Sequence, residues 1–159
     1  MASQKKFGVW MDKQSATVIA KDESIEKGDG DILVLAHIVG EKISPNSSEK
    51  TANNHEKMAQ AKFFKQIASQ LQNATFVHIT GIGQVQEQFM HYLADTPQFK
   101  NTQTVESTST KMSDEKLIEM MGHLFTFYNL LLNGKPIMRC NIYNLPIKNR
   151  LKIFSRQYL

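Results

Sequence analysis

The stretch T-F-V-H-I-T-G-I-G-Q-V-Q-E-Q-F-M-H-Y-L-A-D, residues 75–95, decides the fold. Residues 76–79 favour a strand, and the chain then turns on Gly-Ile-Gly at 81–83. Apolar side chains follow at helical spacing, at Val85, Phe89, Tyr92 and Leu93. A strand that passes through a glycine turn into a helix is half of an α/β unit, so this pattern predicts an α/β domain.

Three strands are predicted before this stretch. Residues 7–11, 16–20 and 32–39 are short apolar runs, and Asp12-Lys13-Gln14-Ser15 gives the first two the turn of a β-hairpin. Together the three runs predict a meander.

The next segment changes from polar to periodic. Residues 41–54 are polar, contain Pro45 and show no period, which predicts a loop. A helix is predicted over 55–72, with Asn53 or Asn54 as its N-cap. Its apolar stripe consists of Met58, Ala61, Phe64, Ile67, Ala68 and Leu71.

The chain after the opening stretch adds one more strand and helix. Residues 102–109 alternate threonine with other residues and predict a polar edge strand. Ser113 is the expected N-cap of a helix that ends at an Asn133-Gly134 C-cap. The predicted order is therefore β-β-β-α-β-α-β-α, followed by a basic tail with a strand and a helix.

Charge separates this tail from the rest of the chain. Residues 1–133 hold 13 basic and 15 acidic residues, a net charge of −2, whereas residues 134–159 hold six basic residues and no acid. We predict an α/β domain over 1–133 and a basic C-terminal tail over 134–159. Two interpretations stay open: the tail binds a polyanion, or it lies on the acidic body and neutralises it.

The tail pattern suits nucleic acid. Residues 137–143 predict a strand, and the spacing of apolar residues after Pro146 predicts an amphipathic helix. Cations that suit phosphates alternate with rings that stack on bases, and the candidate nucleic-acid-binding residues are Lys135, Arg139, Lys148, Arg150, Lys152, Arg156, Tyr143, Phe154 and Tyr158. The competing interpretations are docking on the chain's own body, a homo-oligomer interface, and a membrane-surface helix.

Length and cysteine content bound the class. A chain of 159 residues suits one domain, and a lone cysteine, Cys140, cannot form an internal disulfide. No apolar run is long enough to cross a bilayer, and no secretory signal is recognised. We expect a cytoplasmic protein without a membrane partner.

The glycine turn is a candidate anion or phosphate site at Gly81, Gly83 and Gln84, because a helix start presents free N–H groups. A plain tight turn is the favoured interpretation. Dinucleotide binding is disfavoured because glutamine stands where the fingerprint needs its third glycine, and no cofactor is predicted.

Metal chemistry has weak support. Asp12 ends the first strand, as does the first carboxylate of metal-dependent nucleases, but the other acids show no matching pattern and a hairpin-turn role is favoured. The five histidines lack metal spacing, and His78, His91 and His123 are expected to be structural. No metal site and no catalytic residue are predicted.

Four segments, in order, resemble one family: V-W-M-D-K-Q-S-A-T-V-I, A-K-F-F-K-Q-I-A-S-Q-L, T-F-V-H-I-T-G-I-G-Q-V-Q-E-Q-F-M-H-Y-L and S-D-E-K-L-I-E-M-M. The family is that of the bacterial translational machinery or release-factor-like proteins. It is similar to the middle domain of archaeal and eukaryotic class-one release factors and of Pelota. The resemblance covers about residues 7–125 and implies an α/β sandwich with a mixed β-sheet.

The resemblance also implies a function. The release-factor middle domain promotes peptidyl-tRNA hydrolysis with a Gly-Gly-Gln tripeptide, and this sequence has none. Pelota-like proteins also lack the tripeptide and act by binding the ribosome. We therefore expect a non-catalytic, translation-associated protein that binds the ribosome or RNA. The alternatives are a metal-dependent nuclease or phosphoester hydrolase that uses Asp12, and a homo-oligomeric interaction module.

Overall fold

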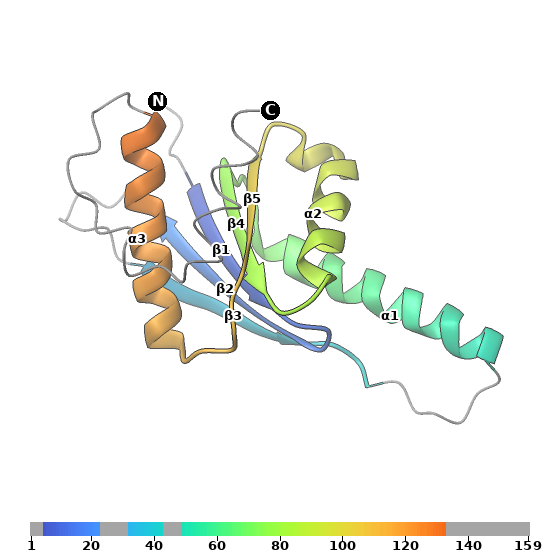
Figure 1. Cartoon of the computed structure of the whole chain (residues 1–159). Coiled ribbons are helices and arrows are strands. Elements are labelled where there is room, and N and C mark those ends of the chain that lie inside the picture. Colours follow the sequence, from blue (N-terminus) through green and yellow to red (C-terminus); the bar gives the residue numbers. More distant parts are fainter. Residues whose placement is uncertain (1–4, 23–31, 43–48, 133–159) are drawn as a thin grey trace.

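The strands gather into one mixed sheet. The computed structural model describes residues 5–22, 32–42 and 49–132 (Figure 1). Their elements are β1 (Lys5–Met11), β2 (Ser15–Asp22), β3 (Ile32–Val39), α1 (Glu49–Gln70), β4 (Phe76–Gly81), α2 (Val85–Asp95), the 3-10 turn η1 (Pro97–Phe99), β5 (Gln103–Thr108) and α3 (Asp114–Leu132). The predicted element order and the α/β class are confirmed.

The strand order in the sheet is β3-β2-β1-β4-β5. Strand β2 is antiparallel to both β1 and β3, which confirms the meander, while β4 is parallel to β1 and β5 is parallel to β4. The short turn after β1 forces β2 to be antiparallel to it, whereas the crossovers through α1 and α2 return the chain to the same end of the sheet. Among the five described strands, four therefore point one way and β2 opposes them.

Helices cover both faces of the sheet, α1 and α2 on one side and α3 on the other (Figure 1). Successive side chains of β1 point to opposite faces of the sheet and so contribute to both cores. Phe7, Val9 and Met11 belong to the core under α1 and α2, while Trp10 belongs to the core under α3. The result is a three-layer α/β/α sandwich.

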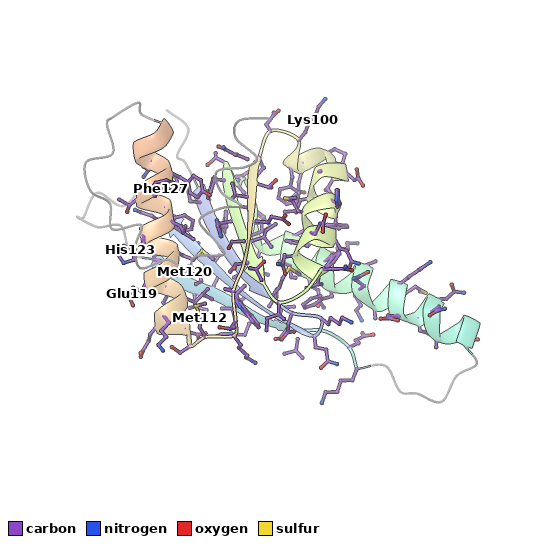
Figure 2. All side chains as sticks on the ribbon, in the orientation of Figure 1. Lys100, Met112, Glu119, Met120, His123 and Phe127 are labelled. Atoms are coloured by element: carbon purple, nitrogen blue, oxygen red, sulfur yellow. The ribbon has the colours of Figure 1, made fainter. Side chains whose placement is uncertain are left out.

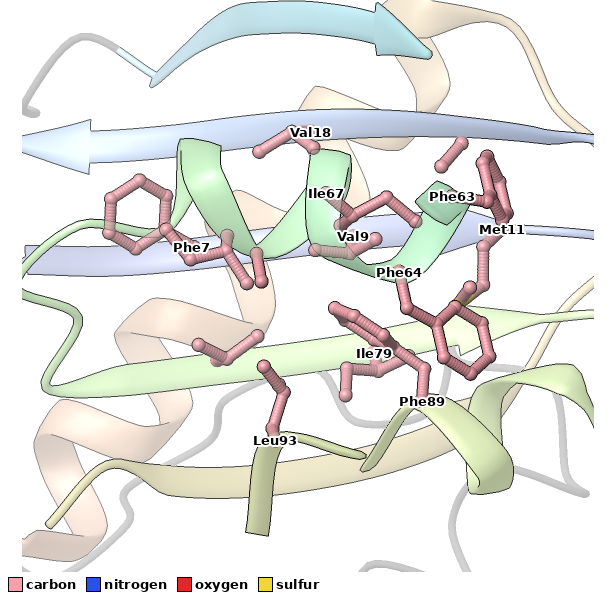
Figure 3. Packing of buried hydrophobic residues seen from close by; sticks show 14 of the residues in the cluster. Phe7, Val9, Met11, Val18, Phe63, Phe64, Ile67, Ile79, Phe89 and Leu93 are labelled. Carbon is pink, nitrogen blue, oxygen red and sulfur yellow. The ribbon is translucent and has the colours of Figure 1, made fainter. Parts of the chain in front are cut away.

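Aromatic rings fill the layer under α1 and α2. Phe64 of α1 and Phe89 of α2 lie with ring centroids 5.2 Å apart, next to Ile67 and Ile79 (Figure 3). Both phenylalanine rings are buried. The predicted apolar face of α2 is confirmed, since Val85, Phe89 and Leu93 are buried and Tyr92 packs against this core.

The layer under α3 contains more sulfur and more polar groups. Gly8 of β1 makes room for Met121, because a Cβ on Gly8 would lie 2.5 Å from the Met121 sulfur. The rings of Phe76 and Tyr128 pack at an angle of 47° with centroids 4.6 Å apart, and His78 lies beside Tyr128. At the start of α3 the Ser113 hydroxyl accepts from the Lys116 N–H at 3.5 Å, as expected of its N-cap.

A bulge lets β3 serve both layers. Val34 pairs with Ile19 and Ala36 pairs with Val18, so Leu35 is an extra residue without a partner in the β2–β3 pairing. On either side of it Val34 packs under α3, and Ile38 packs under α1. Without the bulge, period-two alternation would place both on one face.

Three predictions about α1 are wrong. The helix starts at Glu49, within the predicted loop, so Asn53 and Asn54 lie inside it and do not cap it. Met58 and Ala61 were predicted in the buried stripe and are exposed. Figure 1 shows the reason: the first turns of α1 extend past the sheet, so nothing there selects an apolar face.

Two expectations lie outside the described residues, namely the C-cap of α3 and the whole tail from 134 to 159. None of the helices that the structure describes has the length and apolar character of a membrane span.

Candidate functional site

The carboxyl ends of four strands meet at one edge of the sheet, called here the carboxyl edge. It is marked by Met11 of β1, Val39 of β3, Gly81 of β4 and Thr108 of β5. The connection after β1 leads toward β2, and the connection after β4 leads to β5 on the other side. Between β1 and β4 the strand order therefore reverses, and open α/β sheets bind their ligands at such a point.

The turn after β4 holds this edge together. A Cβ on Gly81 would overlap the carbonyl oxygen of Met11 on the neighbouring strand, so glycine is needed there for packing. Gly83 has φ of +88° and open space around it, which makes it the residue that reverses the chain. Gln84 precedes α2 without capping it through its side chain, and Ile82 is half exposed.

Asp12 organises the neighbouring hairpin turn. Its Oδ1 accepts from the backbone N–H groups of Gln14 at 2.8 Å and Ser15 at 2.6 Å, and its Oδ2 accepts from the Ser15 hydroxyl at 3.1 Å. The hairpin-turn role expected for Asp12 is therefore present. Within the described ranges no three His, Cys, Asp or Glu side chains gather as a metal site would require.

A groove of about 620 Å³ opens between this hairpin, the end of β3, α1 and the start of α2. Five amide side chains line it, together with two lysines and two glutamates. Its apolar lining includes two buried residues, Phe63 and Val85. The polar side chains are Gln14, Asn53, Gln60, Gln84, Gln88, Lys13, Lys57, Glu41 and Glu56. Gln60 Nε2 donates to Gln88 Oε1 at 2.6 Å, which links α1 to α2 across it.

The charges lining the groove balance, so it is no phosphate cradle by charge alone. Amides each carry a donor and an acceptor, and they match base edges or peptide groups. Sequence reasoning missed the groove because its residues come from four distant segments that only the folded sheet brings together.

The predicted anion residues take different places. Gly81 is buried in the sheet, whereas Gly83 and Gln84 are exposed, and Gln84 lines the groove. Gln86, where a dinucleotide fingerprint has its third glycine, is buried, and its Nε2 donates to the Ser107 carbonyl at 3.2 Å. The nine tail residues predicted to bind nucleic acid lie outside the described residues.

The histidines divide into two groups. His78 is fully buried and hydrogen-bonds through Nε2 to the Ser107 hydroxyl at 2.8 Å, which confirms a structural role; burial lowers its pKa to about 4. The expectation for His91 and His123 is wrong. Both are exposed, each 4.0 Å from a glutamate one turn earlier on its helix, and Figure 2 shows His123 with Glu119 on the outer side of α3.

Comparisons with known proteins give distant likenesses only. No family model and no curated protein matches the chain. The Pelota protein of Thermoplasma acidophilum is 14% identical, with 83% of this chain and 42% of that chain covered and a TM-score of 0.46. The archaeal translation termination factor aRF1 is 16% identical, with 82% and 41% covered and a TM-score of 0.45.

A third solved structure, the Pelota of Archaeoglobus fulgidus, is 12% identical, with 82% and 36% covered and a TM-score of 0.47. The chain spans about two fifths of the length of these proteins. TM-scores below 0.5 at such identities establish neither a family nor a function for this chain.

Proposed function

We propose that this chain is a translation-associated protein that acts by binding the ribosome or RNA, without catalysing a reaction of its own. The carrying observation is the exposed Gly83–Gln84 turn beside the amide-lined groove, at the point where the strand order reverses. This turn lies in one of the four segments whose ordered sequences resemble the release-factor-like family, and the α/β sandwich is the fold which that resemblance implies.

The two parts of the chain contribute different forces. The amides of the groove supply hydrogen bonds to uncharged polar groups, each worth about 0.5–1.5 kcal/mol net. The exposed side chain of Ile82 supplies an apolar contact next to them. The six cations of the tail supply the attraction to phosphates, because residues 1–133 carry slightly more acid than base.

A filter-binding titration of the full chain against ribosomes and ribosomal RNA fragments tests this proposal. If four to six of the tail cations contact phosphates, affinity should fall roughly 100- to 1,000-fold between 50 and 200 mM salt. A chain that stops after Asn133 should keep the fold, bind far more weakly and lose most of that salt dependence. Absent binding, or binding that ignores salt, would contradict the proposal.

A further inference from the structure

Strand β3 is a largely apolar edge that carries neither a charged residue nor a proline. Its sequence I-L-V-L-A-H-I-V has no Lys, Glu, Asp or Pro, and Leu33, Leu35 and Val39 are 57%, 46% and 71% exposed. No described strand lies on its outer side. Edge strands are ordinarily blunted by charge, proline or a bulge, or covered by another segment, because their free N–H and C=O groups pair with any strand they meet. Of these devices β3 has the bulge at Leu35, and its apolar side chains stay exposed.

The opposite edge does not share this character. Strand β5 reads Q-T-V-E-S-T, is polar and contains Glu106. The sheet therefore has one polar edge that is suited to water and one apolar edge, at β3, that is suited to a further strand.

The connections of the fold favour the β3 edge as the place for a strand after α3. The crossovers through α1 and α2 both run from the β3 side toward the β5 side over the same face, so they share one hand. Parallel crossovers are right-handed in about 98% of cases. Because α3 lies on the opposite face, a crossover from β5 through α3 to a further parallel strand has this same hand only if that strand lies beyond β3.

The reach of the chain allows this placement. The side chain of Asn129, near the end of α3, hydrogen-bonds Lys6 at the start of β1, and Lys6 pairs with Lys21, which pairs with Ile32 of β3. The outer side of β3 is therefore three strand spacings away across the sheet, about 14 Å, and with a layer spacing of about 10 Å between α3 and the sheet the direct path is about 17 Å. The five residues from 132 to 137 span about 16–18 Å when extended, and they include Gly134 and Pro136, which end helices.

We propose that residues 137–143 add to the outer edge of β3 as a parallel strand. Their sequence I-M-R-C-N-I-Y is one residue shorter than β3. Its alternation puts Met138, Cys140 and Ile142 on one face, which would cover exposed leucine side chains of β3.

A parallel strand ends at the carboxyl edge, and this has a consequence for binding that rests on the proposed function. Residues Gly40 and Glu41, directly after β3, line the groove. The segment after Tyr143 would therefore start near the rim of the groove.

The single native cysteine makes a direct test available, because Cys140 falls in the middle of the added strand. Leu33→Cys, Leu35→Cys and His37→Cys are made one at a time in the full chain and oxidised mildly. At least one should form a disulfide to Cys140 within the same chain, seen as a monomer by non-reducing electrophoresis and mapped by mass spectrometry. The matched controls Gln103→Cys and Thr108→Cys, exposed on β5, should not.

Direction is tested in a Cys140→Ser background. Tyr143→Cys should link to Val39→Cys and not to Ile32→Cys, which lies at the other end of β3 on the same face of the sheet as Val39; the reverse preference means an antiparallel strand and overturns the proposal. Leu35→Cys in this background should stay monomeric, since links between chains would show that a second copy covers β3 instead.

Hydrogen exchange supplies a readout that needs no substitution in β3. The outward amides of β3 should exchange at least about tenfold faster in the chain that stops after Asn133 than in the full chain; equal rates overturn the proposal. The two proposals fail separately. If the disulfide to Cys140 forms but the chain binds neither ribosomes nor RNA, the added strand is supported and the proposed function is wrong. If the chain shows salt-dependent binding but no disulfide forms, the proposed function is supported and the added strand is wrong.

Discussion

Replacing Gly81 with alanine should destabilise the protein much more than the same change two residues later. A Cβ on Gly81 would overlap the Met11 carbonyl oxygen and lie 2.9 Å from its carbonyl carbon, where carbon atoms normally stay about 3.5–4.0 Å apart. The neighbour is backbone, so no rotamer change relieves the clash. The Cβ would lie only 1.8 Å from that oxygen, so strands β1 and β4 would have to separate by more than about 1 Å at their carboxyl ends.

The expected cost of Gly81→Ala is about 3 kcal/mol, at the upper end for overpacking. Gly83→Ala is the matched control. Its Cβ meets nothing within 4 Å, and only the positive φ of 88° opposes it, at about 1 kcal/mol. With a urea m-value of about 2 kcal/mol/M, the unfolding midpoints should fall by about 1.5 M and about 0.5 M. Equal shifts, or a larger shift for Gly83→Ala, would refute the reasoning.

Three further perturbations test other parts of the fold. Burial holds the His78 pKa at about 4, below the unfolded value of 6.5. The contribution of neutral His78 to the free energy of unfolding is therefore complete above pH 6.5, and about 3 kcal/mol of it is lost as pH falls to 4. The urea midpoint of the His78→Gln variant should decline less over that pH range than the midpoint of the original chain. Phe89→Ala should cost about 3–5 kcal/mol by leaving a cavity beside Phe64, measured by thermal unfolding. Asp12→Ala should cost about 1–3 kcal/mol and Asp12→Asn less, because asparagine keeps one acceptor for the turn; identical urea midpoints for the two variants would contradict this role.

Local patterns in the sequence predict much of this fold. The turn at Asp12 is set by a side chain that bonds its own backbone neighbours, and the strand-turn-helix at 76–95 is set by Gly83 and by period. The residues that make up each of these signals are close together in the sequence, so a short window of the sequence contains all of them. Ser113 at the start of α3 is another example.

The missed features depend on distant parts of the chain. The early start of α1 has no apolar stripe to reveal it, because solvent surrounds its first turns. The bulge at Leu35 exists because β3 must bury Val34 and Ile38 in different layers, which is a demand of the whole sheet. The groove needs Lys13, Gln60 and Gln84 side by side, and no single window of the sequence contains them.

The most direct test of the central claim compares two ends of the molecule for ribosome and RNA binding. Lys13→Ala with Gln84→Ala removes a cation and an amide from the carboxyl edge. Lys100→Ala with Gln103→Ala removes the same residue types from the opposite end, where Figure 2 shows Lys100. We expect the first pair to weaken binding about 10-fold and the second to leave it unchanged. Equal losses, or a greater loss at the Lys100 end, would contradict the claim that the carboxyl edge makes the contact.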